Sequence, residues 1–346
     1  MTLDPLRFEP DRVLVLDQTL LPGEEKWIDV RDADAMAAAI ARLQVRGAPA
    51  IGIAAALALA VEGSRGGSVA ERMARLAKAG GVLVASRPTA VNLAWAVDRV
   101  LGVARKVLQS GGEKGDPNRW TEAVRAEALA IWEEDRAASR AMATHGATLF
   151  PSETRFLTHC NTGGLATGGG GTALAVLLEL NRRRPGGIEV WATETRPLLQ
   201  GARLTTFELQ RAEVRVRLIV DSAAAHTILR EGIQGVLVGA DRIARNGDTA
   251  NKIGTLGLAL AAREAGVPFV VVAPSSTIDP GTADGSGIVI EERDPSEVVR
   301  IRGVPAAPEG VQARNPAFDV TPARHISAIV TDRGLFRGPP YALGAD

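Results

Sequence analysis

The chain has 346 residues, and its 40 Lys and Arg balance its 40 Asp and Glu, so its formal net charge is zero. A neutral chain lacks the basic character of a nucleic-acid binder. Apolar residues make up 46% and charged residues 23%, which is ordinary for a globular protein and argues against wholesale disorder. The single Cys excludes an internal disulfide and a cysteine-rich zinc site, and it fits a reducing compartment. The length predicts about two domains.

Targeting and membrane segments are not expected. Residues 1–10 carry charges and no apolar core, unlike a secretory signal. The longest apolar stretch, residues 48–61, is shorter than a membrane span of about 20 residues and is rich in Ala and Gly. We therefore predict a buried helix there and a cytoplasmic protein that does not bind a membrane.

The first part of the chain, residues 1–150, is predicted to be a mostly helical domain with a small β element. Two short strands at residues 13–16 and 26–30 flank a Leu-Pro-Gly-Glu turn, which predicts a hairpin. Asp32 can cap a helix that runs to about Val45. Further helices are expected at 50–61, 69–84, 90–108 and 120–148.

The second part, residues 151–346, alternates β-branched strands with helices, which predicts βαβ units around a parallel sheet and an α/β fold. The chain after Pro274 is expected to be rich in loops. The predicted strands are 155–159, 187–192, 217–221, 235–239 and 269–273, and the predicted helices are 172–183, 202–212, 223–230 and 250–264. In such sheets the ligand lies beyond the carboxyl ends of the strands.

A glycine-rich turn follows the first of these strands and ends in four glycines, Gly168 to Gly171. A turn of this kind that opens a helix can aim backbone N–H groups at a phosphate, but it can equally be a flexible reversal of direction. Neither the dinucleotide pattern G-x-G-x-x-G nor the P-loop pattern G-x-x-x-x-G-K-[ST] occurs, so nucleotide binding loses support.

Cys160 lies at the carboxyl end of the strand that precedes this turn. A thiol there can be activated by helix N-termini, whereas most single cysteines are buried and inert. The position at a strand end makes an activated thiol more common than for an average cysteine, and both interpretations stay open. We interpret the neighbouring His159 as structural, because alternation turns it to the other face of the strand. The four His show no metal-ligand spacing, so we expect no metal site.

Two further strands also end in polar residues. The segment from Glu194 to Arg203 can bind a ligand through Arg and Gln side chains, or it can be an ion-paired helix start. Asp241 follows the strand at 235–239 and can act as an acid or cap a helix. Lys252, near the start of the next predicted helix, suits a phosphate oxygen or a hydroxyl.

These motifs closely resemble the methylthioribose-1-phosphate isomerase family, whose superfamily includes regulatory subunits of translation initiation factor 2B. The matching stretches keep the family's order along nearly the whole chain: residues 46–52, 159–161, 194–197 with 200–205, 238–243, 251–255 and 315–322.

The resemblance implies an N-terminal helical domain at 1–150, a Rossmann-like catalytic domain at 151–346, and a homodimer. It implies conversion of 5-methylthio-D-ribose 1-phosphate to 5-methylthio-D-ribulose 1-phosphate in methionine salvage, without a cofactor. Cys160 and Asp241 match the family's catalytic pair. The matched substrate contacts are Arg46, Gly47, Ala48, Arg87, Gln200, Asn251 and Lys252. Gly170 stands where the family usually has an aromatic residue, which is expected to loosen the glycine-rich turn.

Two other functions compete with this one. A non-catalytic binding protein, like the factor subunits, would not need Cys160, Asp241 and Asn251-Lys252 together, so their joint presence favours an enzyme. An isomerase for 5-deoxyribose 1-phosphate or ribose 1,5-bisphosphate is the other candidate. For the chemistry, an enolate route and a hydride shift from C2 to C1 both stay open.

Overall fold

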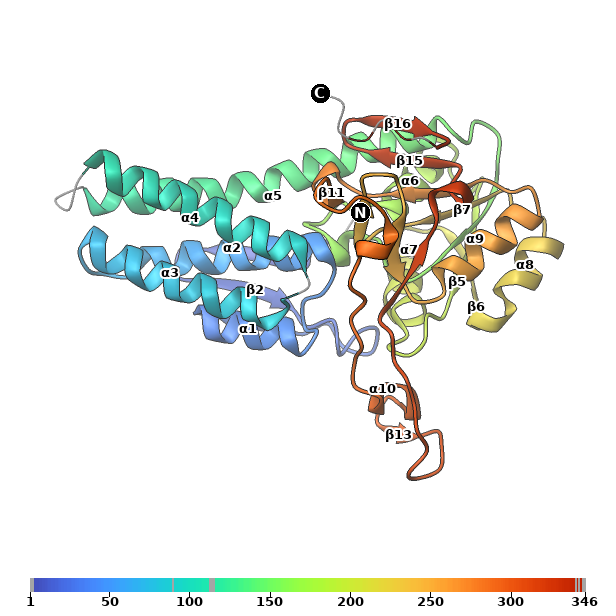
Figure 1. The fold of residues 1–346 in the computed structure, drawn as a ribbon, viewed down its shortest axis with the longest axis horizontal. Helices are drawn as coiled ribbons and strands as arrows, with labels where there is room; N and C mark the ends of the chain where they lie inside the picture. The colour runs from blue at the N-terminus through green and yellow to red at the C-terminus, as the bar shows by residue number, and fades with distance from the viewer. Residues whose placement is uncertain (1–2, 89, 112–115, 340, 342, 344–346) are drawn as a thin grey trace. The chain divides into compact units, whose positions relative to one another are not determined.

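The computed structural model describes residues 3–88, 90–111, 116–339, 341 and 343, and it divides into two compact units (Figure 1). The first, here called the helical unit, comprises Thr2–Ala137 and Gly164–Gly171. The second, the sheet unit, comprises Ala138–Gly163 and Thr172–Asp346. The glycine-rich turn therefore belongs to the compact unit built by the first part of the chain.

The helical unit begins with a three-stranded antiparallel sheet in the order β1-β2-β3: β1 is Leu6–Glu9, β2 Arg12–Leu16 and β3 Trp27–Val30. The predicted hairpin, β2 with β3, is confirmed. Strand β1 was not predicted, because four residues that alternate apolar and charged side chains carry a weak signal by themselves. Pairing with β2 along its whole length supplies the missing stability.

Five helices complete this part of the chain: α1 Ala33–Ala41, α2 Ala48–Ser64, α3 Val69–Ser86, α4 Val91–Gly111 and α5 Pro117–Ala147. The Asp32 carboxylate accepts a hydrogen bond from the Ala35 amide at 2.7 Å, as a helix cap should. Helix α1 ends four residues before the predicted Val45, because Leu43 adopts a left-handed φ of 60° that no helix can continue.

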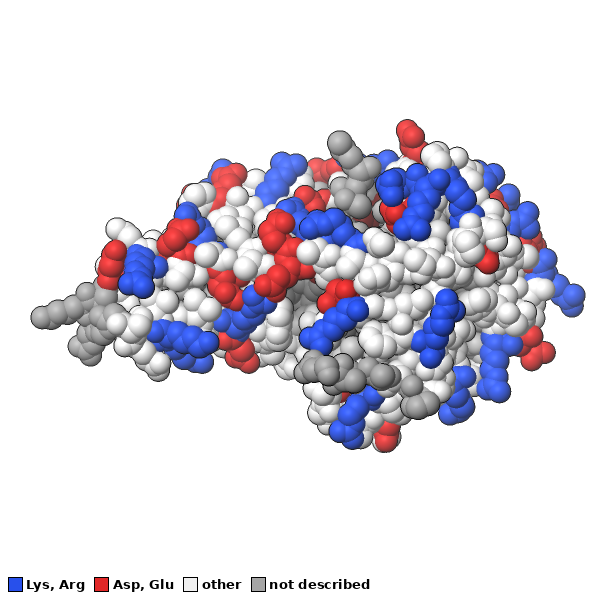
Figure 2. Space-filling model, turned by 90° about the horizontal axis from the view of Figure 1, so that it is seen from above, with Lys and Arg blue, Asp and Glu red and all other residues white. Residues whose placement is uncertain are grey.

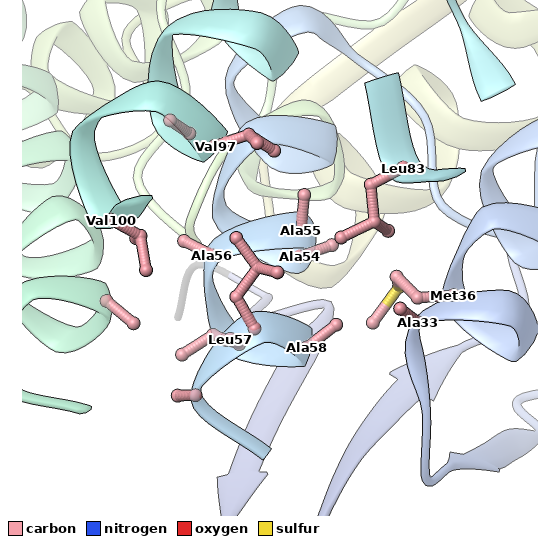
Figure 3. Packing of buried hydrophobic residues seen from close by; sticks show 14 of the residues in the cluster. Ala33, Met36, Ala54, Ala55, Ala56, Leu57, Ala58, Leu83, Val97 and Val100 are labelled. Atoms are coloured by element: carbon pink, nitrogen blue, oxygen red, sulfur yellow. The ribbon is translucent and has the colours of Figure 1, made fainter. Parts of the chain in front are cut away.

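Helix α2 is the centre of the helical unit, and the buried helix predicted at residues 48–61 is confirmed. Its small residues let neighbours approach closely: a Cβ on Gly52 would lie 2.7 Å from the Asn92 carbonyl oxygen at the start of α4. Figure 3 shows Leu57 and its alanine neighbours surrounded by Met36 of α1, Leu83 of α3 and Val97 of α4. Small side chains on all faces explain why so apolar a segment is a core helix.

The sheet unit is built on seven strands in the order β16-β15-β10-β7-β4-β5-β6. They are β4 Arg155–Thr158, β5 Glu189–Thr193, β6 Arg215–Ile219, β7 Gly235–Val238, β10 Phe269–Val272, β15 Ala328–Thr331 and β16 Gly334–Arg337. All neighbours are parallel except β15 and β16. The five predicted strands and the parallel sheet are confirmed. Strands β15 and β16 fall in the region expected to be loops.

Helices cover both faces of this sheet, and the strand side chains alternate between them. Val236 and Val238 of β7 pack in a cluster with α8 (Ala224–Arg230) and α9 (Thr255–Glu264). Leu237 packs instead with α6 (Ala173–Arg183), α7 (Thr206–Arg211) and the end of α5. A strand buried on both faces has a continuous run of apolar residues in its sequence, and β7 has such a run.

The helix predicted at residues 250–264 begins later in the structure than the sequence indicates. Residues expected to begin a helix at Ala250 form strand β9, Thr249–Lys252, and α9 begins only at Thr255. Gly254, with a left-handed φ of 103°, separates the two. Strand β9 joins a second sheet in the order β11-β8-β9-β14, with β11 Ile278–Asp279, β8 Arg242–Ala244 and β14 Phe318–Thr321. Its partner β14 comes from much later in the chain, which local sequence cannot reveal.

Two smaller features complete the sheet unit. A five-residue π-helical turn, Gly201–Thr205, occupies the first part of the helix predicted at 202–212, and α7 follows it. Helix α10, Ser296–Val299, leads into the short hairpin of β12 (Arg300–Ile301) and β13 (Val304–Pro305).

On the face seen in Figure 2, basic and acidic side chains are interspersed. Within the described residues, no helix has both the length and the apolar character needed to cross a membrane.

Candidate active site

Cys160 and Asp241 follow the carboxyl ends of two adjacent strands. Cys160 comes two residues after β4, and Asp241 comes three residues after β7. These strands are parallel neighbours, with Thr158 opposite Leu237. The chain leaves β4 for β5 on one side, while β7 lies on the other, so the strand order reverses here. Ligands of open α/β sheets bind at such a reversal, beyond the carboxyl ends.

The backbone of Cys160 is held in a strained conformation by two threonines. Its φ of 62° is left-handed, which is uncommon for a residue other than Gly and is found where function requires it. The Cys160 amide donates to the Thr195 hydroxyl oxygen at 2.9 Å, and the Cys160 carbonyl accepts from the Thr205 hydroxyl. The side chain is partly exposed. Cys160 is therefore a partly exposed residue on a fixed backbone.

The segment after β5 is fixed in turn by Asp221, which follows β6. The Asp221 carboxylate accepts from the amides of Thr195 at 2.7 Å and Arg196 at 2.6 Å. The Arg196 guanidinium donates to the carbonyls of Pro197 and Val298. Neither of the two interpretations of this segment, a ligand contact or an ion-paired helix start, describes Arg196, because its guanidinium binds two backbone carbonyl oxygens.

Gln200 lies at the start of the π-helical turn with 5% of its surface exposed. Among the described residues, none bonds to its side-chain oxygen Oε1. A buried, unpaired amide oxygen costs free energy unless a ligand or water satisfies it. The turn itself needs Gly201, since a Cβ there would lie 1.8 Å from the Thr193 carbonyl oxygen.

Asn251 and Lys252 lie on strand β9, so the interpretation of Lys252 as a residue at a helix start was wrong. Asn251 is buried and its amide nitrogen donates to the Thr255 hydroxyl at 3.0 Å. The Lys252 ammonium donates to the Ala317 carbonyl at 2.9 Å and lies 4.7 Å from the centre of the Phe318 ring. Strand β14 thus orients the charge of Lys252.

Asp241 does not cap a helix, because strand β8 follows it directly. Its backbone amide donates to the Ala250 carbonyl at 2.9 Å, which ties the loop after β7 to β9. The helix-cap interpretation is wrong, and the segment that carries Asp241 is bound to the strand that carries Asn251 and Lys252.

His159 is buried and hydrogen-bonded through both ring nitrogens, in agreement with the structural role predicted for it. Nδ1 lies 2.6 Å from the Thr193 hydroxyl, and Nε2 lies 2.8 Å from the Ile253 carbonyl. Burial lowers the pKa of His159; the hydrogen bond to the Ile253 carbonyl and the charge of Asp221 oppose this effect, and Lys252 adds to it. The ring is neutral at physiological pH.

The other predicted substrate contacts belong to the helical unit. Gly47, with a left-handed φ of 99°, caps α2 between Arg46 and Ala48, and a Cβ on it would lie 2.3 Å from the Ala166 carbonyl oxygen. Arg87 directly follows α3. The start of α2 is therefore in close contact with the segment that leads into the glycine-rich turn.

Three side chains of α5 bind the backbone of Gly168 in that turn. The Asp135 carboxylate accepts from its amide at 2.7 Å, while Trp132 and Arg136 donate to its carbonyl at 2.8 and 3.2 Å. Burial raises the pKa of Asp135 to about 6. These contacts anchor the turn two residues before Gly170.

Asp221 and Thr205 fix the backbone around Cys160 and Thr195, and the sequence interpretation assigned neither of them to the candidate site. Asp221 carried a signal, because it follows a strand end just as Cys160 and Asp241 do. Thr205 lies in the stretch 200–205 that matches the family, but only its position in the fold shows that its hydroxyl binds the Cys160 carbonyl. Within the described residues, no three His, Cys, Asp or Glu side chains are grouped so that they could hold a metal ion.

Comparison with known proteins identifies relatives over nearly the whole chain. The 5-deoxyribose 1-phosphate isomerase of Moorella thermoacetica is 51% identical over 339 residues, covering 97% of this chain and 95% of that protein. The methylthioribose-1-phosphate isomerase of Chloroflexus aurantiacus is 49% identical over 344 residues, covering 99% and 97%.

A solved structure agrees with these relatives. The crystal structure of 5-methylthioribose 1-phosphate isomerase from Pyrococcus horikoshii superposes with a TM-score of 0.89 at 40% identity, over 98% of this chain and 93% of that one. Residues 44–338 match the initiation factor 2 subunit family. The chain therefore belongs to the initiation factor 2 subunit family, together with these sugar-phosphate isomerases.

Proposed function

We propose that this chain is an aldose–ketose isomerase that converts 5-methylthio-D-ribose 1-phosphate to 5-methylthio-D-ribulose 1-phosphate in methionine salvage, without a cofactor. The observation that carries the proposal is the position of Cys160 and Asp241 after the carboxyl ends of adjacent strands β4 and β7. Relatives about 50% identical over nearly their full length bear the name of this enzyme.

The reaction needs an acid because the anomeric oxygen of the substrate carries phosphate, so no free aldehyde forms. In our proposal the protonated Asp241 donates to the ring oxygen, and the bond between that oxygen and C1 breaks to leave a cationic C1. The Asp241 carboxylate then takes the proton of the C2 hydroxyl as the C2 ketone forms.

Hydrogen can move from C2 to C1 by two balanced routes. In the enolate route the Cys160 thiolate removes the C2 proton, its electron pair forms the C1–C2 double bond, and the thiol returns the proton to C1. In the hydride route hydrogen moves from C2 to C1 with its electron pair, and Cys160 only positions the substrate. Deuterium from solvent at C1 of the product supports the first, and full retention of the C2 hydrogen supports the second.

Substrate binding is proposed for seven residues. Gln200 offers its unpaired buried oxygen to a sugar hydroxyl, and Lys252 offers a fixed positive charge to a phosphate or hydroxyl oxygen. The full proposed set is Arg46, Gly47, Ala48, Arg87, Gln200, Asn251 and Lys252.

The test is to follow ketose formation from methylthioribose 1-phosphate by NMR, with Cys160→Ala and Asp241→Asn as variants. Each variant is expected to lose at least about 100-fold in rate, as for removal of a general acid or base. Asp29→Asn, which removes a surface carboxylate paired with Arg12 and Arg31, is the matched control and should keep the wild-type rate. A wild-type protein without turnover rejects the isomerase and favours a binding protein.

A second candidate substrate is 5-deoxyribose 1-phosphate, because a relative at 51% identity is named for it. The two sugars differ only in the methylthio group at C5. Measuring kcat/KM for both decides between them: an apolar site for the methylthio group predicts a 10- to 200-fold preference for methylthioribose 1-phosphate. Equal values would make the chain a general 5-deoxypentose 1-phosphate isomerase.

We further propose a Rossmann-like catalytic domain at 151–346 after an N-terminal domain at 1–150, a homodimer, and a cytoplasmic location. The strand order around β4 supports the first of these, since three parallel strands lie to one side of it and two to the other. Sedimentation equilibrium tests the dimer, which predicts twice the 36.3 kDa chain mass. A single-chain mass would overturn it.

A further inference from the structure

The buried ring of His159 has no role in the proposed chemistry, yet its hydrogen bonds define its protonation. A backbone carbonyl can only accept, so Nε2 carries the proton and donates it to Ile253 at 2.8 Å. Nδ1 is then the acceptor for the Thr193 hydroxyl at 2.6 Å. With 2% of its surface exposed, the ring is a neutral link of fixed length between two segments.

Both partners of His159 belong to segments that carry proposed site residues. Thr193 ends β5, two residues before the Thr195 whose hydroxyl binds the Cys160 amide. Ile253 directly follows Asn251 and Lys252. The ring also lies against the turn into α9, where a Cβ on Gly254 would be 3.2 Å from its Cε1 atom. His159 is itself the neighbour of Cys160 in the chain.

We propose that His159 is a positioning residue that holds the Asn251-Lys252 segment in register with Cys160, through the bond from Nε2 to the Ile253 carbonyl. The proposal deepens the isomerase function and rests on it for its kinetic consequence. Displacing a substrate contact by about 1 Å can cost about 100-fold in rate, so the bond matters without touching the substrate.

Two substitutions separate this bond from the rest of the ring. The amide nitrogen of His159→Gln reaches about as far as Nε2 and can donate to Ile253, whereas the shorter amide of His159→Asn ends near the position of Nδ1. We expect kcat/KM for methylthioribose 1-phosphate to stay within about 5-fold of wild type in His159→Gln, and to fall about 100-fold in His159→Asn.

His145→Asn is the matched control, because His145 also binds a backbone carbonyl, that of Thr331, and none of the proposed site residues. It should leave kcat/KM unchanged. Equal losses in His159→Gln and His159→Asn, or wild-type kinetics in His159→Asn, would overturn the positioning role.

Hydrogen exchange tests the same link without turnover. His159→Asn should speed exchange of the amides from Ile253 to Thr255 at least 10-fold, and His159→Gln should not. Unchanged exchange in His159→Asn overturns the proposal even if activity falls. A wild-type protein that fails to isomerise rejects the proposed function, and the exchange result still decides whether His159 holds this segment.

Discussion

The Thr195 hydroxyl oxygen accepts a hydrogen bond from the Cys160 amide at 2.9 Å, and both residues adopt a left-handed φ of 62°. Two strained residues on neighbouring strand ends thus stabilise each other. The strain is local to the proposed catalytic thiol, where sparsely populated backbone conformations are common.

Thr195→Val removes this acceptor and should destabilise the protein by about 1–3 kcal/mol, because the Cys160 amide is left without its partner. Thr195→Ser keeps the hydroxyl, so its free energy of unfolding should fall by less than half of the decrease in Thr195→Val. Urea unfolding measures both. Equal losses in the two variants would show that the methyl group of Thr195, not its hydroxyl, matters.

The raised pKa of Asp135 predicts how the stability of the protein depends on pH. Its pKa in the folded protein is about 6, above the usual 3.8, so between these values the folded state holds a proton that the unfolded state has lost. The free energy of unfolding should therefore fall as pH rises from 4 to 6, by about 3 kcal/mol at 1.4 kcal/mol for each pKa unit.

Asp135→Asn cannot titrate, so its unfolding free energy should decline less than that of wild type over the same range. Arg136 lies beside Asp135 and pairs with both Asp4 and Glu133. Asp34→Asn, at an exposed position in α1, is the control and should follow the wild-type curve. Parallel curves for Asp135→Asn and wild type would contradict the prediction.

Gly47→Ala should destabilise the helical unit by at least about 2 kcal/mol. The position combines a left-handed φ of 99° with a contact of 2.3 Å between the new Cβ and the Ala166 carbonyl, which is backbone and cannot rotate away. Gly81→Ala, in α3 of the same unit, meets nothing within 4 Å and should instead stabilise by about 0.5–1 kcal/mol. Thermal unfolding of the two variants should shift in opposite directions.

Lys252→Met should lower kcat/KM by about 100-fold or more, because it removes a fixed charge from the proposed substrate site. Its effect on stability should be small, since Met retains much of the contact with Phe318. The exposed Lys78 in α3 provides the control, and Lys78→Met should be neutral in both assays. Steady-state kinetics that are unchanged in Lys252→Met would remove this residue from the proposed binding set.

Local sequence signals predicted most of the elements correctly. The apolar run at 48–61 became the buried helix α2, and the apolar run at 235–239 became β7, covered on both faces. These predictions worked because the period and length of an apolar pattern depend on near neighbours alone. The polar residues after the strand ends pointed to the proposed site for another reason: in a parallel sheet all carboxyl ends share one edge.

Long-range pairing decided what the sequence could not. Asn251 and Lys252 looked like the start of a helix, but pairing with β8 and with the distant β14 made them a strand. The link from His159 to Ile253 joins residues 94 positions apart, and Asp221 binds Thr195 from 26 positions away. By itself the sequence determined the α/β fold class and predicted the residues that we propose for the chemistry. Only the tertiary structure decided how those residues are oriented, because a hydrogen bond between distant segments forms only after the whole chain has folded.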